Sequence, residues 1–172
     1  LFCVDAVVVR QGKVSLVYRK NKPAKDQWWV PGGRVLKNET LEQAVHRKMK
    51  EELGVPVTIQ KRLGTYETMF PDAPFPEVTC GVHSVNVAFL VTLVNEQDAL
   101  QLDNQSSDYH WVNNLDENSH PYLKALFHDA GITPFPESSV QLRRVKQQLP
   151  SCRRHHNLLP DDLYAAVQEH LP

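Results

Sequence analysis

The stretch Gly33-Arg-Val-Leu-Lys-Asn-Glu-Thr-Leu-Glu-Gln-Ala-Val-His-Arg-Lys-Met-Lys-Glu-Glu-Leu-Gly-Val55 decides the fold of this 172-residue chain. Thr40 and Gln43 have the spacing of a capping box, which predicts a helix that begins next to Thr40. Apolar residues then recur at intervals of three and four and give the helix one apolar stripe: Leu41, Ala44, Val45, Met49 and Leu53. Gly54 suits the left-handed residue that follows a helix, so the helix is expected to end there.

The polar face of this predicted helix carries two adjacent carboxylates, Glu51 and Glu52, near its C-terminus. The partial negative charge of a helix C-terminus disfavours carboxylates, so the pair needs a compensating cation. Arg47 lies one turn before Glu51 and supplies part of that charge. A bound divalent metal ion would supply the rest.

The same stretch resembles the Nudix box, in which glycine, glutamate and arginine positions precede a pair of glutamates and a glycine. Seven residues fall in register with that pattern: Gly33, Glu39, Arg47, Glu51, Glu52, Gly54 and Val55. One position departs from it, because Lys48 stands where the common box has the first of three metal-binding glutamates. Lys48 lies one turn before Glu52, and a cation there should repel a metal ion. This helix is therefore expected to bind fewer metal ions than a full box.

Strand-like segments lie on both sides of the helix. They are residues 2–9, 14–18, 57–69, 81–94 and 109–112, and a second helix is predicted over residues 121–128. This order predicts an α+β fold, and the Nudix resemblance implies an α/β/α sandwich with a mixed β-sheet. Residues 1–136 are expected to form the Nudix domain. Residues 137–172 are basic at first and predict a helical C-terminal extension.

The composition excludes several classes of partner. A formal net charge of −1 gives no field that would steer the chain toward nucleic acid or an anionic membrane. No apolar run has the length of a membrane span. The cysteines Cys3, Cys80 and Cys152 are odd in number and lack metal-site spacing, which indicates reduced thiols and a cytoplasmic location.

Within the Nudix superfamily, the chain from about residue 3 to about residue 135 resembles the GDP-mannose mannosyl hydrolases. Four segments carry this likeness: 19–24, 28–35, 39–42 and 108–111. The resemblance implies a homodimer that acts on a nucleotide sugar. It also implies one Mg²⁺, for which Mn²⁺ could substitute, held by the Gly32 carbonyl, Glu52 and Gln105. It places five more residues around the leaving GDP: Asp5, Arg19, Arg34, Arg47 and His83.

The chemistry of sugar–phosphate cleavage asks for such residue types. Arg19 and Arg34 can each bind phosphate oxygens bidentately and neutralise charge on the leaving group. Asp5 lies in an apolar strand and needs a partner, which favours a site or hydrogen-bonding role. His83 is alone in a predicted strand, so its position is compatible with two roles, a site residue or a histidine of the core. We therefore predict Asp5, Arg34, His83 and Glu51 as catalytic candidates, with Asp5, Arg19 and Arg34 binding substrate.

The residue after Gln105 separates three hypotheses. In the mannosyl hydrolases a histidine follows this glutamine and acts as general base, whereas Ser106 follows it here in a predicted polar loop. A histidine placed at 106 would then be expected to restore a base. The first hypothesis is hydrolysis at sugar C1 with release of GDP. The second is a pyrophosphohydrolase that attacks phosphorus, and the third is a nucleotide-sugar sensor without activity.

Overall fold

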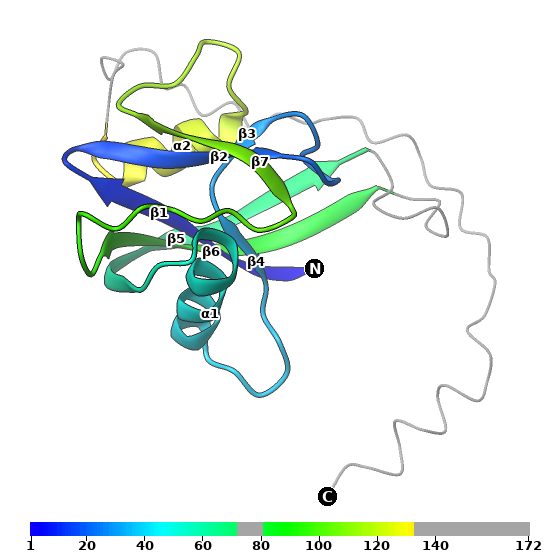
Figure 1. Cartoon of the computed structure of the whole chain (residues 1–172). Helices are drawn as coiled ribbons and strands as arrows, with labels where there is room; N and C mark the ends of the chain where they lie inside the picture. The colour runs from blue at the N-terminus through cyan, green and yellow to red at the C-terminus, as the bar shows by residue number, and fades with distance from the viewer. Residues whose placement is uncertain (72–80, 133–172) are drawn as a thin grey trace, which may run out of the picture.

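The computed structural model describes residues 1–71 and 81–132 (Figure 1). Its elements in chain order are β1 (Phe2–Arg10), β2 (Lys13–Arg19), β3 (Trp28–Trp29), β4 (Gly32–Arg34), α1 (Leu41–Leu53), β5 (Val57–Phe70), β6 (Val82–Leu93), β7 (Ser106–Val112) and α2 (Pro121–Asp129). The predicted extension over residues 137–172 lies outside the described residues. No described helix has the length and apolar character needed to cross a membrane.

The helix α1 has the boundaries that its sequence predicts. Thr40 is the N-cap, and its hydroxyl accepts a hydrogen bond from the Gln43 amide while the Gln43 side chain accepts one from the Thr40 amide. Gly54 is left-handed with φ 69° and ends the helix. Both ends are therefore fixed by local interactions, which is why the sequence pattern alone locates them.

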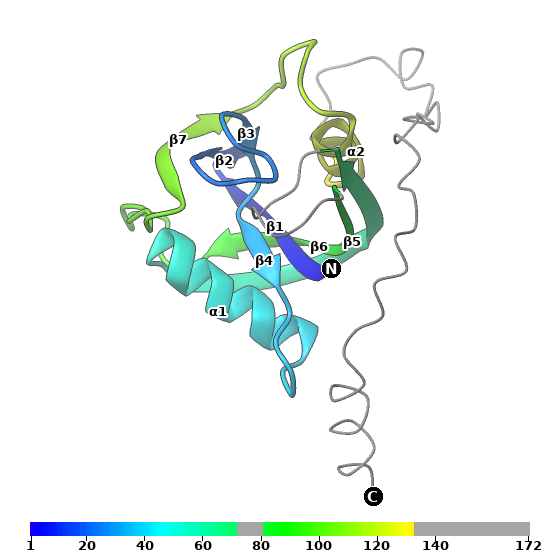
Figure 2. The ribbon, with the colours of Figure 1, turned by 90° about the vertical axis from the view of Figure 1, so that its right-hand side faces the viewer.

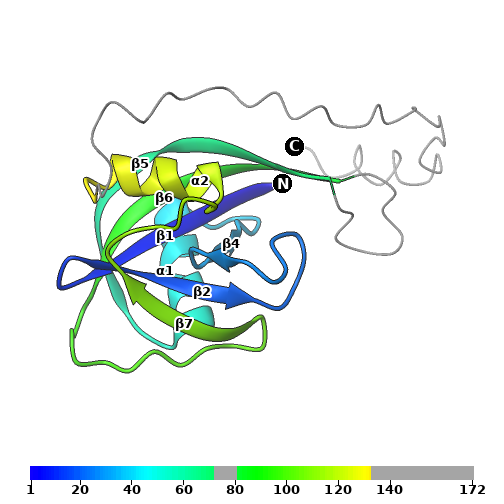
Figure 3. The same cartoon turned by 90° about the horizontal axis from the view of Figure 1, so that it is seen from above.

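The strands form one mixed sheet in the order β3-β2-β1-β6-β5, while β4 also pairs with β1 and β7 with β2. β1 runs parallel to β6, whereas its pairings with β2 and β4 are antiparallel. The long strands β5 and β6 lie side by side along the whole hairpin (Figure 3). The α+β class and the mixed sheet predicted from the sequence are thus confirmed.

Two helices cover opposite faces of this sheet (Figure 2). Alternate residues of β1 explain why: Val4, Ala6 and Val8 belong to the core under α1, and Val7 belongs to the core under α2. Asp5 follows the alternation of Val7 and therefore faces the α2 side. Asp5 on β1 therefore lies on the face of the sheet opposite to α1, the helix that carries Glu51 and Glu52.

The strand boundaries differ from the prediction at two places that matter for the site. The sequence predicted no strand between residue 18 and α1, but Gly32–Arg34 form β4, which pairs with β1 in the register Asp5↔Gly32. β7 begins at Ser106 rather than near residue 109, because its pairing with β2 extends to Arg19↔Ser106. Pairing with a partner strand, which no local pattern encodes, sets both boundaries.

Candidate active site

A cavity of about 670 Å³ opens where β1, β4 and the β5–β6 hairpin meet the segments after β2 and before β7. It brings together residues that are far apart in the chain. Eight residues singled out from the sequence line it: Asp5, Arg19, Gly32, Arg34, Arg47, Lys48, His83 and Gln105. Glu51 and Glu52 do not line it and lie behind it on α1.

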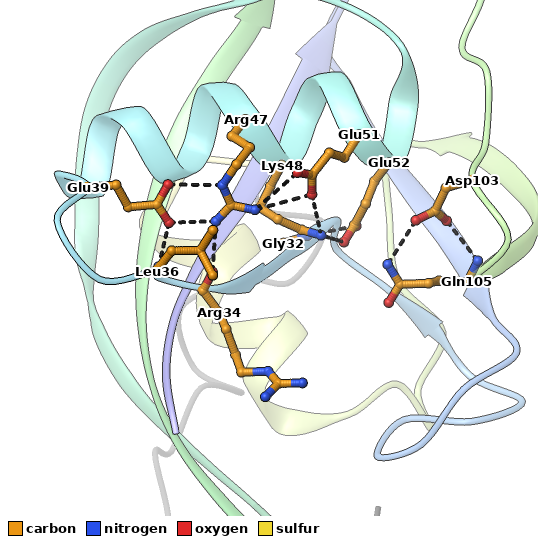
Figure 4. Close-up of polar contacts among 10 residues, drawn as sticks. All are labelled: Gly32, Arg34, Leu36, Glu39, Arg47, Lys48, Glu51, Glu52, Asp103 and Gln105. Carbon is orange, nitrogen blue, oxygen red and sulfur yellow. Dashed lines mark hydrogen bonds and ion pairs between the residues drawn. The ribbon is translucent and has the colours of Figure 1, made fainter. Parts of the chain in front are cut away.

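Arg47 joins the segment before α1 to the end of that helix. Its guanidinium donates to Glu39 through Nε at 2.9 Å and Nη2 at 2.5 Å, to the Arg34 carbonyl at 3.0 Å, and to Glu51 through Nη1 (Figure 4). The Arg47 guanidinium lowers the pKa of Glu39 to about 2. The expected Arg47–Glu51 pair is present, with 3.2 Å between Nη1 and Oε2. Arg47 therefore holds the end of β4, which carries Arg34, in place.

Glu52 is buried, with 3% of its surface exposed, and it has two partners. Its Oε2 accepts a hydrogen bond of 3.1 Å from the Gly32 amide. Its Oε1 lies 2.8 Å from Lys48 Nζ but accepts no well-aligned hydrogen bond from any described residue. Burial raises the pKa of Glu52, and the nearby Lys48 ammonium opposes that shift.

Gln105 is held by a residue that the sequence analysis did not single out. Asp103 accepts hydrogen bonds of 2.8 Å from both the backbone amide and the side-chain Nε2 of Gln105. This fixes the orientation of the amide, and the Oε1 atom is turned away from Asp103 (Figure 4). An aspartate two residues before a turn residue is a recognisable Asx pattern, so the sequence did contain a signal.

The oxygen atoms of Gly32, Glu52 and Gln105 are suited to bind one hard divalent cation. Glu52 Oε1, which is buried and has only the Lys48 ammonium beside it, and the Gln105 Oε1 atom are the kind of oxygen ligands that Mg²⁺ prefers. Among the described residues, no three His, Cys, Asp or Glu side chains gather as a metal cluster. The set is thus too small for a closed cage, and a bound Mg²⁺ would take its remaining ligands from water and phosphate.

Asp5 has the partner that its burial requires. The Tyr122 hydroxyl of α2 donates a hydrogen bond to Asp5 Oδ2. Burial raises the pKa of Asp5 to about 7, although the hydrogen bond from Tyr122 and the charge of Arg19 lower it, while Glu52 adds to the rise. Tyr122 lies 117 residues away in the chain, so the sequence contained no signal for this pair.

The cavity has a cationic side suited to an anion. Arg19, Arg34, Lys22 and Lys48 line it. Arg19 Nε is buried and donates to no acceptor among the described residues, and the Arg34 guanidinium points away from the Arg47 network (Figure 4). A buried N–H donor such as Arg19 Nε is costly to leave without an acceptor, which a ligand oxygen could supply. This side of the cavity can therefore hold phosphate oxygens.

His83 is placed at the rim of the cavity and apart from the other candidates. Its Nε2 lies 3.1 Å from Glu67 Oε1, and its side chain is 53% exposed. The burial of β6 alternates, with Ser84 buried and His83 exposed, so the two side chains lie on opposite faces of the strand. His83 is thus neither a core histidine nor near Asp5, and its Glu67 partner makes it a surface residue.

The structure corrects the environment expected for Ser106. This serine is the first residue of β7, is only 6% exposed and does not line the cavity, whereas Gln105 does. The sequence predicted a polar loop at this residue, whereas Ser106 lies at the end of a strand and pairs with Arg19 of β2. A histidine at 106 would have to be buried, so it is not expected to deliver a general base to the cavity.

A row of small polar side chains on the opposite wall was also missed. Thr68, Ser84 and Asn86 line the cavity and are each no more than 6% exposed. Asn86 Nδ2 donates a hydrogen bond of 3.0 Å to Thr68 Oγ1. Ser84 and Asn86 alternate with valines in β6, and polar residues at inward positions of a strand are a signal that the sequence offered.

Gly32 leads to a prediction about stability. A Cβ atom at Gly32 would lie 2.1 Å from Asp5 Oδ1 and 2.4 Å from the Val4 carbonyl oxygen. Because the Val4 backbone cannot move cheaply, Gly32→Ala is expected to lower the free energy of unfolding by about 3 kcal/mol or more. Gly12→Ala meets no atom within 4 Å and is strained only by its φ of +75°, so it should cost about 1–2 kcal/mol. Equal urea midpoints for the two variants would contradict this.

Comparisons with known proteins agree with the fold. The family model described as NUDIX domain matches residues 2–131. The low-salt glycan biosynthesis protein Agl8 of Haloferax volcanii is 44% identical over 72% of this chain and 78% of its own length. An ADP-ribose pyrophosphatase of Methanocaldococcus jannaschii is 28% identical over 72% of this chain and 69% of its own length.

Solved structures share the fold at low identity. A MutT protein of Methanosarcina mazei superposes with a TM-score of 0.59 at 21% identity, over 74% of this chain and 90% of the other. A MutT Nudix hydrolase of Burkholderia pseudomallei gives a TM-score of 0.55 at 22% identity, over 74% and 95%. Because the family model covers residues 2–131, which is nearly all of the described part of the chain, this chain belongs to the Nudix hydrolase family.

Proposed function

We propose that this chain is a Mg²⁺-dependent hydrolase of a nucleotide sugar of the GDP-mannose kind, and that water attacks sugar C1 to release the sugar and GDP. One observation carries the proposal. Arg47 pairs with Glu51 and not with Glu52, so Glu52, which accepts a hydrogen bond from the Gly32 amide, is the carboxylate of the pair that lies against β4. One metal ion on this carboxylate, together with the cationic side chains of the cavity, would neutralise the charge of a leaving diphosphate.

The residues of the chain take distinct roles in this reaction. Arg19 and Arg34 bind the diphosphate and stabilise the charge that develops on the β-phosphate oxygen as the bond to C1 breaks. Gly32, Glu52 and Gln105 would hold the metal ion, which would supply further charge neutralisation. Arg47 positions the end of β4, and with it Arg34, through its hydrogen bond to the Arg34 carbonyl.

The opposite wall supports a substrate with a polar ring. Thr68, Ser84 and Asn86 offer hydroxyl and amide groups, and Trp29 and Phe70 give an apolar surface nearby. Sugar hydroxyls and base edges both need such hydrogen-bonding groups in a partly apolar setting. The relative from Haloferax volcanii is named for glycan biosynthesis, which favours a substrate that contains a sugar.

A second candidate is attack on phosphorus, which would release a sugar phosphate and a nucleoside monophosphate. The burial of Ser106 favours it, because the cavity receives no general base from that position. A relative is named as an ADP-ribose pyrophosphatase, so this reaction class also occurs among similar chains. The same cationic wall would serve either reaction.

The decisive experiment is hydrolysis of GDP-mannose in ¹⁸O-water with Mg²⁺, beside a panel of other nucleotide sugars. Attack at C1 gives free sugar that carries the label and unlabelled GDP. Label in a phosphate product would overturn the C1 proposal in favour of the phosphorus reaction. A chain that binds the panel but turns over none of it would overturn both reactions and indicate a sensor.

A further inference from the structure

A lysine side chain lies buried against the two carboxylates at the end of α1. Lys48 is 8% exposed, and a Cβ atom on Gly33 would lie 2.7 Å from Lys48 Cε, so the aliphatic part is packed against the β4 backbone. Its ammonium lies 2.8 Å from Glu52 Oε1 and 3.2 Å from Glu51 Oε2 (Figure 4). The fold thus delivers one fixed positive charge to both carboxylates.

The two carboxylates differ in how much they depend on this charge. Glu51 is half-exposed and also pairs with Arg47. For the buried Glu52, Lys48 is the one cation within ion-pair distance among the residues that the structure describes. A buried carboxylate without a cation is strongly destabilising, so the free protein keeps Glu52 compensated through Lys48.

A divalent ion on the same oxygen would lie next to the ammonium. Mg²⁺ binds carboxylate oxygens at about 2.0–2.1 Å, and Lys48 Nζ is 2.8 Å from that oxygen. Two cations so close in a partly buried site repel each other strongly. Lys48 must therefore weaken divalent binding at Glu52, or move when a metal ion enters.

We propose that the Lys48 ammonium is a tethered cation that stands in for a divalent ion at the Glu51–Glu52 pair, and that it keeps the pair poor in metal while no substrate is bound. The proposal rests on the proposed function in one respect, the role of Glu52 as a metal ligand. It adds that removal of the Lys48 charge converts the pair into a stronger metal site. In such a variant a bound metal ion, in place of the lysine ammonium, would compensate the charge of Glu51 and Glu52.

The test is a Mn²⁺ titration of the free protein, without nucleotide, followed by the electron paramagnetic resonance signal of unbound Mn²⁺. Lys48→Met and Lys48→Gln should bind Mn²⁺ at least about tenfold tighter than the wild type, a low figure for removing a like charge at about 4 Å. Lys50→Met is the matched control, because Lys50 is an exposed lysine on the same helix. It should bind Mn²⁺ as the wild type does.

Melting temperatures provide a second readout. In chelator, Lys48→Met should melt below the wild type, and saturating Mg²⁺ should restore most of the loss, whereas Mg²⁺ should leave the wild type nearly unchanged. Lys48→Gln keeps a hydrogen-bond donor and serves if Lys48→Met folds poorly. Equal Mn²⁺ affinities in all the variants, or a wild type stabilised by Mg²⁺ as much as Lys48→Met, would overturn the proposal. Because these measurements use no substrate, their outcome does not depend on which reaction the enzyme catalyses.

Discussion

Glu52→Gln is expected to lower turnover by more than about 100-fold, because even residues that only support a metal ligand typically contribute 10- to 100-fold. The amide keeps the shape of the side chain but removes the charge that faces Lys48 and the proposed metal ion. Steady-state turnover at saturating Mg²⁺ gives the loss in rate, and circular dichroism shows whether the variant folds. Full activity in Glu52→Gln, or in excess chelator, would contradict the proposed metal site.

Two control variants sharpen this result. Glu42→Gln changes an exposed glutamate in the first turn of α1 and should leave turnover unchanged. Glu51→Gln should cost less than Glu52→Gln if the attack is at carbon, because Glu51 pairs with Arg47 and Lys48. Equal losses in Glu51→Gln and Glu52→Gln would instead argue for attack on phosphorus, where both carboxylates serve metal or water.

Arg34→Ala is expected to lower kcat by about 10²- to 10³-fold, the range for removal of one donor that stabilises developing charge. Arg34 lines the cavity and is exposed at the end of β4, so little structural stability should be lost. Arg34→Lys should recover only part of the rate, because an ammonium cannot bind two phosphate oxygens in the planar geometry of arginine.

The matched control for this prediction is Arg62→Ala. Arg62 is an exposed arginine on β5 that donates to Thr65 and does not line the cavity. It should retain the wild-type rate and the same affinity for GDP. If Arg34→Ala keeps kcat and only raises KM, Arg34 binds the ground state and the transition state equally, and its proposed catalytic role is wrong.

Sequence patterns located those elements whose ends depend on residues close by in the chain. Thr40, Gln43 and Gly54 locate α1 because capping and the left-handed stop act over a few residues. The spacing of Lys48 and Glu52, one helical turn apart, already brought the ammonium next to the carboxylate. The fold class followed from the same source, since the order of periodic segments limits the possible layers.

Tertiary structure alone decided how the other site residues are arranged. Asp5 meets Tyr122 across 117 positions, and the face to which His83 points depends on the register of β6 against β5. Ser106 became buried because β7 extends its pairing with β2 to Arg19. The physical reason is common to all three: a strand is completed by a distant partner, so its ends and the faces of its side chains are fixed only when the sheet assembles.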